Sequence, residues 1–115
     1  MIERKAGGVL VTADPLFNTQ RDRLVVLAAR HAIPAIFDSR EYVAGGGLMS
    51  YGANYSDTYR SAGIYAGRIL GGAKPGELPV VQASKFELVV NLRTAKTLGF
   101  TLPPMVLALA DEVIE

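Results

Sequence analysis

The sequence has no cysteine, one histidine and no excess of charge of either sign. Without cysteine the chain cannot form disulfides, zinc ribbons or a thiolate nucleophile. The absence of cysteine does not indicate whether the protein is located in a reducing or an oxidising compartment. The lone His31 cannot provide a three-histidine metal site. The net charge of +1 argues against nucleic acid held on a broad basic surface.

Long apolar runs are also missing. No stretch approaches the roughly 20 residues that cross a bilayer. Residues 1–11, MIERKAGGVLV, lack the apolar stretch and small-residue cleavage site of a secretory signal. What the sequence does contain is 115 residues of which 50% are hydrophobic, enough for one small domain. We therefore expect a single α/β unit without a membrane span.

The sequence predicts a strand–helix–strand unit near the start of the chain. Residues 8–13 (GVLVTA) and 33–37 (IPAIF) are short apolar runs typical of buried parallel strands. Between them, apolar side chains recur at helical spacing. Asn18 or Thr19 is the expected helix cap, Thr19 through a capping box with Asp22. A connection of this kind makes the two strands parallel, with a right-handed crossover.

Further elements are expected along the rest of the chain. Glycine and proline turn signals separate them, and their hydrophobic periodicity assigns their type. The expected elements are a helical turn opened by an Asp38–Glu41 capping box, a strand at 48–52, a helix at 56–70, strands at 78–82 and 86–90, a short helix at 93–98 and a final helix at 105–114.

Two carboxylates mark the best candidate site. Asp14 and Asp38 each follow a strand of the same predicted unit, and ligands of open parallel sheets bind in the crevice at the carboxyl ends of strands. Carboxylates in such a place can receive an ammonium group or hydroxyl groups. Each aspartate also has a purely structural interpretation, because Asp14 precedes Pro15 in a turn and Asp38 is a suitable helix cap.

Aromatic side chains lie in the neighbouring segments. Phe17 follows the first strand, Tyr42 follows the second, and Tyr51 and Tyr55 flank the exit of the third expected strand. Flat, rigid rings beside a crevice supply contact area for an organic ligand. The alternative is that tyrosines at helical spacing, Tyr55 and Tyr59, form the core face of their helix.

Four segments occur in a recognisable order: VTADPLF, HAIPAIFDSREYVAGGGLMSYG, GGAKPGELPV and KFELVVNLRTAKTLGFTLPP. Their order resembles the C-terminal part of the solute-binding proteins of bacterial ABC transporters, in the subfamily linked to uptake of aromatic amino acids and related small organic solutes. The resemblance spans residues 7–104. Its most specific pieces are the GGGLMSYG…Y…G pattern and the end of the last segment at Asn91 to Ala95.

The resemblance implies a type I periplasmic-binding fold, in which two Rossmann-like α/β lobes joined by crossover strands close on a ligand. It assigns residues 7–47 to the second lobe and residues 48–104 to the crossover and first lobe, with the strand at 86–90 in the first lobe. Residues 105–115 form the C-terminal helix. No cofactor is implied. Carried over by position, the ligand-binding residues are Asp14, Phe17, Asp38, Ser39, Tyr42, Tyr51 and Tyr55.

Proteins of this kind are much longer and carry a signal peptide. We therefore expect an incomplete fold whose parallel strands lack neighbours. The chain would then be either a truncated product, or a fragment that forms a homo-oligomer in which copies complete each other's sheets. The implied partners are a small solute such as an amino acid and an ABC permease, without nucleic acid. The implied location is the periplasm, or the cytoplasm if this chain is the full product.

Two other functions stay open from the residues alone. Asp14 and Asp38 could hold magnesium or manganese in a small enzyme of phosphoryl transfer or hydrolysis, although lysine and Ser/Thr partners are missing beside them. A ligand-sensing lobe of a transcription regulator shares the binding-protein fold, but no helix-turn-helix precedes the first strand. The preferred interpretation is solute binding without catalysis.

Overall fold

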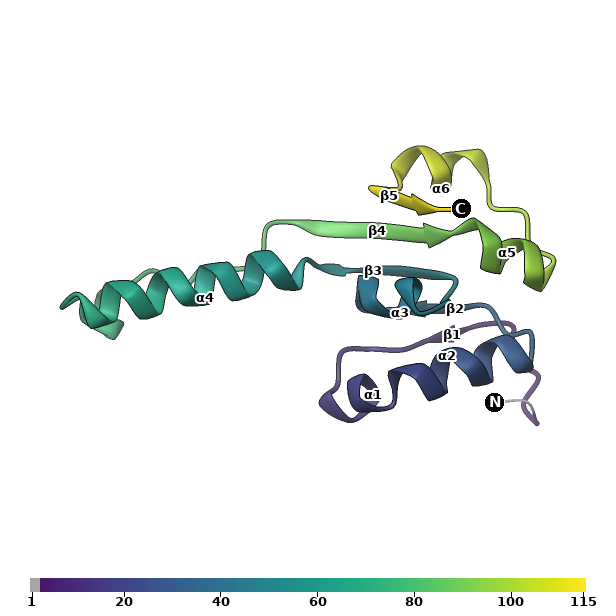
Figure 1. The fold of residues 1–115 in the computed structure, drawn as a ribbon, viewed down its shortest axis with the longest axis horizontal. Helices are drawn as coiled ribbons and strands as arrows, with labels where there is room; N and C mark the ends of the chain where they lie inside the picture. The colour runs from purple at the N-terminus through teal and green to yellow at the C-terminus, as the bar shows by residue number, and fades with distance from the viewer. Residues whose placement is uncertain (1–2) are drawn as a thin grey trace.

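The computed structural model describes residues 3–115, in which strands and helices alternate along most of the chain (Figure 1). Proline lies in the first turn of α1 and of α6, where its missing N–H costs no helical hydrogen bond. The elements are β1 (Val9–Leu10), α1 (Pro15–Thr19), α2 (Arg21–Arg30), β2 (Ala35–Phe37), α3 (Arg40–Ala44), β3 (Met49–Ala53), α4 (Tyr55–Leu70), the 3-10 turn η1 (Pro75–Glu77), β4 (Phe86–Asn91), α5 (Leu92–Leu98), α6 (Pro104–Leu109) and β5 (Glu112–Ile114).

The five strands form one mixed sheet in the order β1-β2-β3-β4-β5. β1, β2 and β3 run parallel, with Val9 beside Ala35 and Ile36 beside Met49. β4 runs antiparallel to β3, and β5 is parallel to β4. The predicted strand–helix–strand unit is therefore confirmed, and so is the parallel pairing of its strands.

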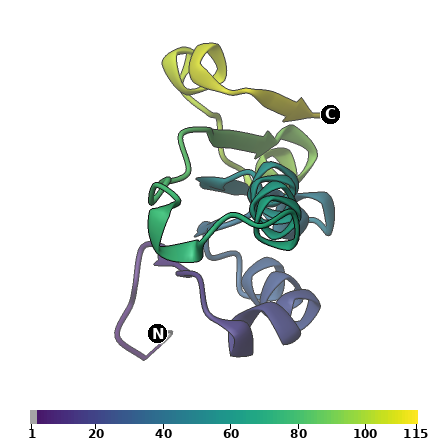
Figure 2. The ribbon, with the colours of Figure 1, turned by 90° about the vertical axis from the view of Figure 1, so that its left-hand side faces the viewer.

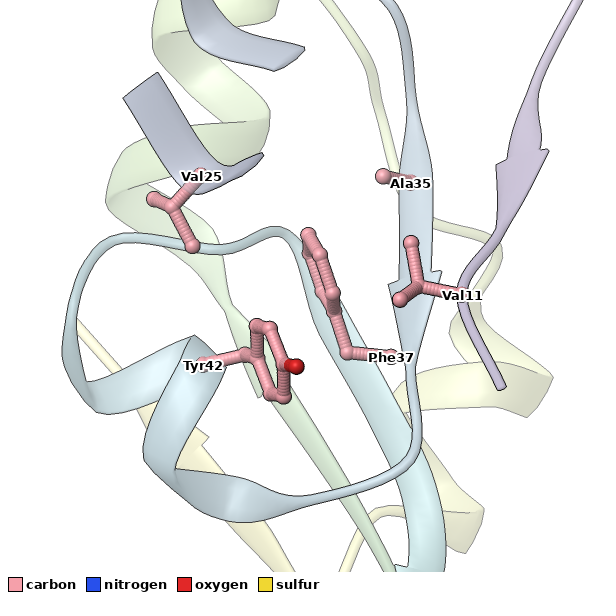
Figure 3. Packing of buried hydrophobic residues seen from close by; sticks show 5 residues of the cluster. All are labelled: Val11, Val25, Ala35, Phe37 and Tyr42. Atoms are coloured by element: carbon pink, nitrogen blue, oxygen red, sulfur yellow. The ribbon is translucent and has the colours of Figure 1, made fainter. Parts of the chain in front are cut away.

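The core lies between the β1–β2 part of the sheet and the helices α2 and α3. Figure 2 shows the helices α2, α4 and α5 to one side of the strands. Phe37 and Tyr42 stack with their ring centroids 4.5 Å apart, and Val25 of α2 packs against them (Figure 3). Gly47 allows the chain to pass close by, because a Cβ there would lie 2.8 Å from the Tyr42 carbonyl oxygen and 2.9 Å from the Phe37 ring.

The helix α4 projects from one end of the sheet as an arm (Figure 1). None of its 16 residues is buried, and Tyr59 is among its exposed large side chains. The return segment 78–85 is held to the arm by a 2.5 Å hydrogen bond from Tyr65 Oη to the Pro79 carbonyl. The resulting radius of gyration is 17.4 Å, against about 13 Å for a compact domain of this length. Within residues 3–115, therefore, no other element covers the helix α4 well enough to bury any of its side chains.

The C-terminal segment differs from the prediction. The helix α6 ends at Leu109, and residues 112–114 form a strand instead of continuing the expected helix at 105–114. The Asp111 amide donates to the Leu88 carbonyl, and the Leu88 amide donates to Asp111 Oδ2, both at 2.8 Å. These bonds to β4 draw the chain into the sheet, where the β-branched residues that follow fit a strand.

The segments 78–82 and 86–90 also differ from what the sequence predicted. The strand expected at 78–82 is wrong, because this segment lies beside α4, where no neighbouring strand offers backbone partners. The segment at 86–90 was expected in a lobe apart from residues 7–47, yet it joins the same sheet through β3. The division into two lobes itself stays a prediction.

Among the described residues no helix combines the length and the apolar character that a membrane crossing requires.

Candidate functional site

The carboxyl ends of the parallel strands meet at one end of the sheet, the end from which α4 projects (Figure 1). Asp14 follows β1 after a short loop, and Asp38 follows β2 directly. Tyr51 lies in β3 one residue past the pairing of Phe37 with Ser50. Because these strands are parallel neighbours, the structure brings the two predicted carboxylates to the same end of the sheet, at the carboxyl ends of the strands (the carboxyl edge), where α/β proteins bind ligands.

Asp14 is fixed in place as a helix cap. Its Oδ1 accepts a hydrogen bond from the Leu16 amide at 2.8 Å, at the N-terminus of α1. The predicted caps are wrong, because Asn18 and Thr19 lie inside α1 and the N-cap position of α2 is Gln20, which makes no side-chain cap bond. The Asp14 residue is exposed, so its second carboxylate oxygen is accessible.

Asp38 is positioned by two residues from other elements. Its Oδ2 accepts a hydrogen bond from Tyr55 Oη at 2.7 Å. Gly52 of β3 packs on its main chain so closely that a Cβ there would lie 1.8 Å from the Asp38 carbonyl oxygen. The predicted capping box with Glu41 is wrong, since Ser39 is the N-cap of α3 and makes no side-chain cap bond. Asp38 Oδ1 accepts no hydrogen bond from residues 3–115.

Tyr55 is the first residue of α4, so the hydroxyl that holds Asp38 comes from the base of the arm. Asn54 fixes this helix start, because its Oδ1 accepts a hydrogen bond from the Asp57 amide at 3.0 Å and its Nδ2 donates to the Glu87 carboxylate on β4. The hydrogen bond to Asp38, then burial and the charge of Asp38, raise the pKa of Tyr55 to about 12. The phenol therefore remains a hydrogen-bond donor at neutral pH.

Tyr42 and Ser39 are packed inside the fold. Tyr42 is 1% exposed and stacks on Phe37; burial, with a contribution from the charge of Asp38, raises the pKa of the Tyr42 phenol. Ser39 is 3% exposed, and its Oγ has no hydrogen-bond partner among residues 3–115. Both side chains therefore have a packing role in this conformation, and their expected contacts with a ligand stay a prediction.

Tyr51 and Phe17 are the accessible aromatic rings of the expected set. Tyr51 is 58% exposed, and its ring stacks on Phe86 with centroids 5.9 Å apart and an interplanar angle of 21°. Phe17 lies on α1 and is partly exposed. Sequence reasoning missed Phe86, because nothing local indicates that the start of β4 lies diagonally across from Tyr51 on β3.

An ion pair formed by Arg40, two residues after Asp38, was also not predicted. Arg40 Nε and Nη2 donate to the two carboxylate oxygens of Glu112, each at 2.6 Å. These hydrogen bonds, and then the opposite charges, raise the pKa of Arg40, and the hydrogen bond lowers that of Glu112. The pair ties the start of α3 to β5 across 72 positions of sequence, a separation over which no local pattern gives a signal.

The donor set at this edge suits an organic cation better than a metal. Within residues 3–115 no three His, Asp or Glu side chains gather as a metal-ligand group. Asp14 and Asp38 each already accept one hydrogen bond from the protein. Mg²⁺ and Ca²⁺ take six or more oxygen ligands, whereas an ammonium group needs only hydrogen-bond acceptors such as the second carboxylate oxygen of Asp14 or Asp38.

The sequence matches the family model of ABC transporter substrate binding proteins over residues 1–114. Among curated proteins none matches significantly. Two solved structures are similar over almost the whole chain. A conserved domain protein from Vibrio cholerae O1 biovar El Tor strain N16961 has 29% identity and a TM-score of 0.89, with 97% of this chain and 38% of that chain covered. The ABC domain in complex with L-Trp from Streptococcus pneumoniae has 28% identity and a TM-score of 0.88, with 98% and 38% covered.

A third structure is the ligand-free, open form of a substrate binding protein with adhesive properties from Clostridium difficile, with 26% identity, a TM-score of 0.59, and 92% of this chain and 36% of that chain covered. The chain thus spans less than two fifths of the length of these relatives. The predicted α/β fold, like that of periplasmic binding proteins and incomplete beside them, is confirmed. With a family match that covers nearly every residue, this chain belongs to the family of ABC transporter substrate-binding proteins.

Proposed function

We propose that this chain supplies part of the solute cleft of an ABC importer's binding protein, and that the solute is a small organic molecule with an amino group and an aromatic or apolar body. The observation that carries the proposal is the carboxylate of Asp38. It lies at the carboxyl edge of the sheet, one oxygen is held by Tyr55 Oη at 2.7 Å, and the other accepts no hydrogen bond from residues 3–115.

The chemistry of the edge supports the choice of ligand. An ammonium group donates to Asp38 Oδ1, while the Tyr55 hydroxyl keeps the carboxylate oriented from its other oxygen. Asp14 offers a second accessible carboxylate after the neighbouring strand. The exposed ring of Tyr51, backed by Phe86, offers a flat surface for the body of the solute.

The comparisons support the same class of solute. One structure that shares the fold over 98% of this chain is a complex with L-Trp, which has an ammonium group and an aromatic body. The partner that follows from the family is the permease of an importer, and the place of action is outside the cytoplasmic membrane. Aromatic amino acids are therefore the first ligands to test.

Calorimetry with this chain tests the proposal. L-tryptophan and tryptamine, which keep the amino group, should bind, whereas indole-3-propionate, which lacks it, should bind at least about tenfold more weakly. Asp38→Asn should weaken tryptophan binding by a similar factor, because it removes the charge that faces the ammonium group. Asp22→Asn is the matched control, since the Asp22 side chain on α2 is almost fully exposed.

Three results would overturn the proposal. The first is absence of heat for every ligand with folded protein, as judged by circular dichroism. The second is equal affinity for tryptophan and indole-3-propionate. The third is an Asp38→Asn variant that binds tryptophan as the wild type does.

A further inference from the structure

The helix α2 begins at the carboxyl edge with an arginine. Its first residue is Arg21, and α1 and the start of α2 lie at the end of the sheet from which α4 projects (Figure 1). Within residues 3–115 the ionic contact of this guanidinium is with the next residue, Asp22, at 3.8 Å, and the Asp22 side chain is 92% exposed. So long and so exposed a pair contributes little, and the guanidinium is therefore available to a ligand.

Two other cations close to this edge are already paired within residues 3–115. Arg40 donates to both carboxylate oxygens of Glu112, each at 2.6 Å. Lys85, the residue before β4, lies 3.4 Å from the carboxylate of Asp57 on α4. Each of these two cations is held by an acid from another element, whereas Arg21 is not.

The helical repeat gives the orientation of Arg21. Val25 lies one turn further along α2 and hence on the same face. It is buried in the cluster that contains Phe37 and Tyr42 (Figure 3). Arg21 thus lies on the face that α2 turns toward α3, one turn closer to the carboxyl edge. Its side chain is 37% exposed. Arg23, two positions on, lies off this face and is exposed.

The buried phenol of Tyr42 lies near the charges of both Asp38 and Arg21. Burial is the main cause that raises the pKa of Tyr42. The charge of Asp38 raises this pKa further, whereas the charge of Arg21 lowers it. Two charged groups that act on one hydroxyl lie close to the same place, so this agrees with the position that the helical repeat gives to Arg21.

A solute with a carboxylate needs a cation at this edge. The proposed ammonium site has two carboxylates, Asp14 and Asp38, and both repel a carboxylate on the same solute. A guanidinium offsets this repulsion. It also presents its N–H groups in a planar fork that matches the two oxygens of a carboxylate. Arg21 is the side chain at the edge that has this chemistry and no partner from another element within residues 3–115.

We propose that Arg21 binds the α-carboxylate of the solute, so that the cleft selects an α-amino acid over an amine with the same body. This inference rests on the proposed function, because the ammonium group of the solute is held by Asp38. The guanidinium donates to the carboxylate oxygens of the solute, while Asp38 Oδ1 accepts from its ammonium group. Substrate and site then carry opposite charges at both ends of the amino acid group.

Calorimetry with L-tryptophan and tryptamine tests the inference, because tryptamine keeps the indole and the amine but lacks the carboxylate. The wild type should bind L-tryptophan at least about tenfold more tightly than tryptamine. Arg21→Met retains an apolar stem without the guanidinium, so it should remove this preference by weakening tryptophan binding, without weakening tryptamine binding. Arg21→Lys should keep part of the preference, because it keeps the charge but not the fork.

Arg23→Met is the matched control, since it makes the same change of charge on the same helix at an exposed position; it should leave both affinities unchanged. Folded wild type that binds neither ligand would contradict the proposed function, and this inference with it. Equal binding of the two ligands by the wild type would overturn only the role of Arg21. The same holds if Arg21→Met, folded as judged by circular dichroism, keeps the preference for tryptophan or weakens both ligands equally.

Discussion

Replacing Tyr55 by phenylalanine removes the hydroxyl that donates to Asp38 Oδ2 at 2.7 Å, and we expect it to destabilise the fold. A hydrogen bond to a charged group contributes about 1.5–3 kcal/mol to folding. This one is only partly buried, so solvent screens some of the interaction. The expected loss in unfolding free energy at neutral pH is therefore about 1–2 kcal/mol.

The pH dependence of this loss follows from the raised pKa of Tyr55. The phenol has a pKa of 10.0 as a free group and about 12 in the fold. Its contribution to stability is therefore fully present below pH 10 and is lost as the pH rises through 12. Two pKa units correspond to at most about 2.7 kcal/mol, which screening reduces to a value similar to that expected from the hydrogen bond itself.

Urea unfolding of the wild type and Tyr55→Phe, at one protein concentration and at several pH values, measures this effect. Tyr59→Phe is the control, because the Tyr59 ring is largely exposed on the same helix; its stability should stay within about 0.5 kcal/mol of the wild type. The difference between the wild type and Tyr55→Phe should shrink as the pH approaches 12. No loss at neutral pH, or a loss that does not change with pH, would refute the role given to the Asp38–Tyr55 hydrogen bond.

Two further predictions concern packing and charge around the same site. Gly52→Ala should lower the unfolding free energy by about 3 kcal/mol, because the added Cβ meets the Asp38 carbonyl at 1.8 Å. Gly63→Ala on α4, with nothing within 4 Å, should instead raise it by about 0.5–1 kcal/mol, and equal thermal unfolding of the two variants contradicts this. Glu112→Gln should cost about 0.5–1 kcal/mol, since the ion pair with Arg40 is partly exposed. Because the pKa of Glu112 is lowered from 4.5, the extra stability of the wild type over Glu112→Gln is present above that pH and is lost in acid. Acid unfolding of the two proteins at the same midpoint pH would disprove it.

Local patterns were sufficient to predict the elements that carry the site. The apolar runs before Asp14 and Asp38, with helical periodicity between them, predicted two parallel strands and hence two carboxylates at one edge. The strand at 48–52 and the helix at 56–70 also agree with β3 and α4 within a residue. These features depend on neighbours in sequence, so sequence periodicity reports them directly.

Contacts between distant segments account for what the sequence did not reveal. Residues 112–114 become a strand because β4 offers them a ladder, and residues 78–82 stay irregular because no strand lies beside them. The role of Asp38 depends on Tyr55, which is 17 positions away. No local pattern indicated that the Tyr42 ring is buried against Phe37 in the core, and its predicted contact with a ligand stays a prediction.

The most direct test of the account is a nuclear magnetic resonance titration of the 15N-labelled chain with L-tryptophan. If the solute binds at the carboxyl edge of the parallel strands, the largest amide shifts fall around Asp14, Asp38 and Tyr51, while β5 at the far edge of the sheet changes little. Shifts centred on the apolar hollow between β1 and α2, which Val9, Val11 and Leu24 line, or no shifts at millimolar tryptophan, would contradict it.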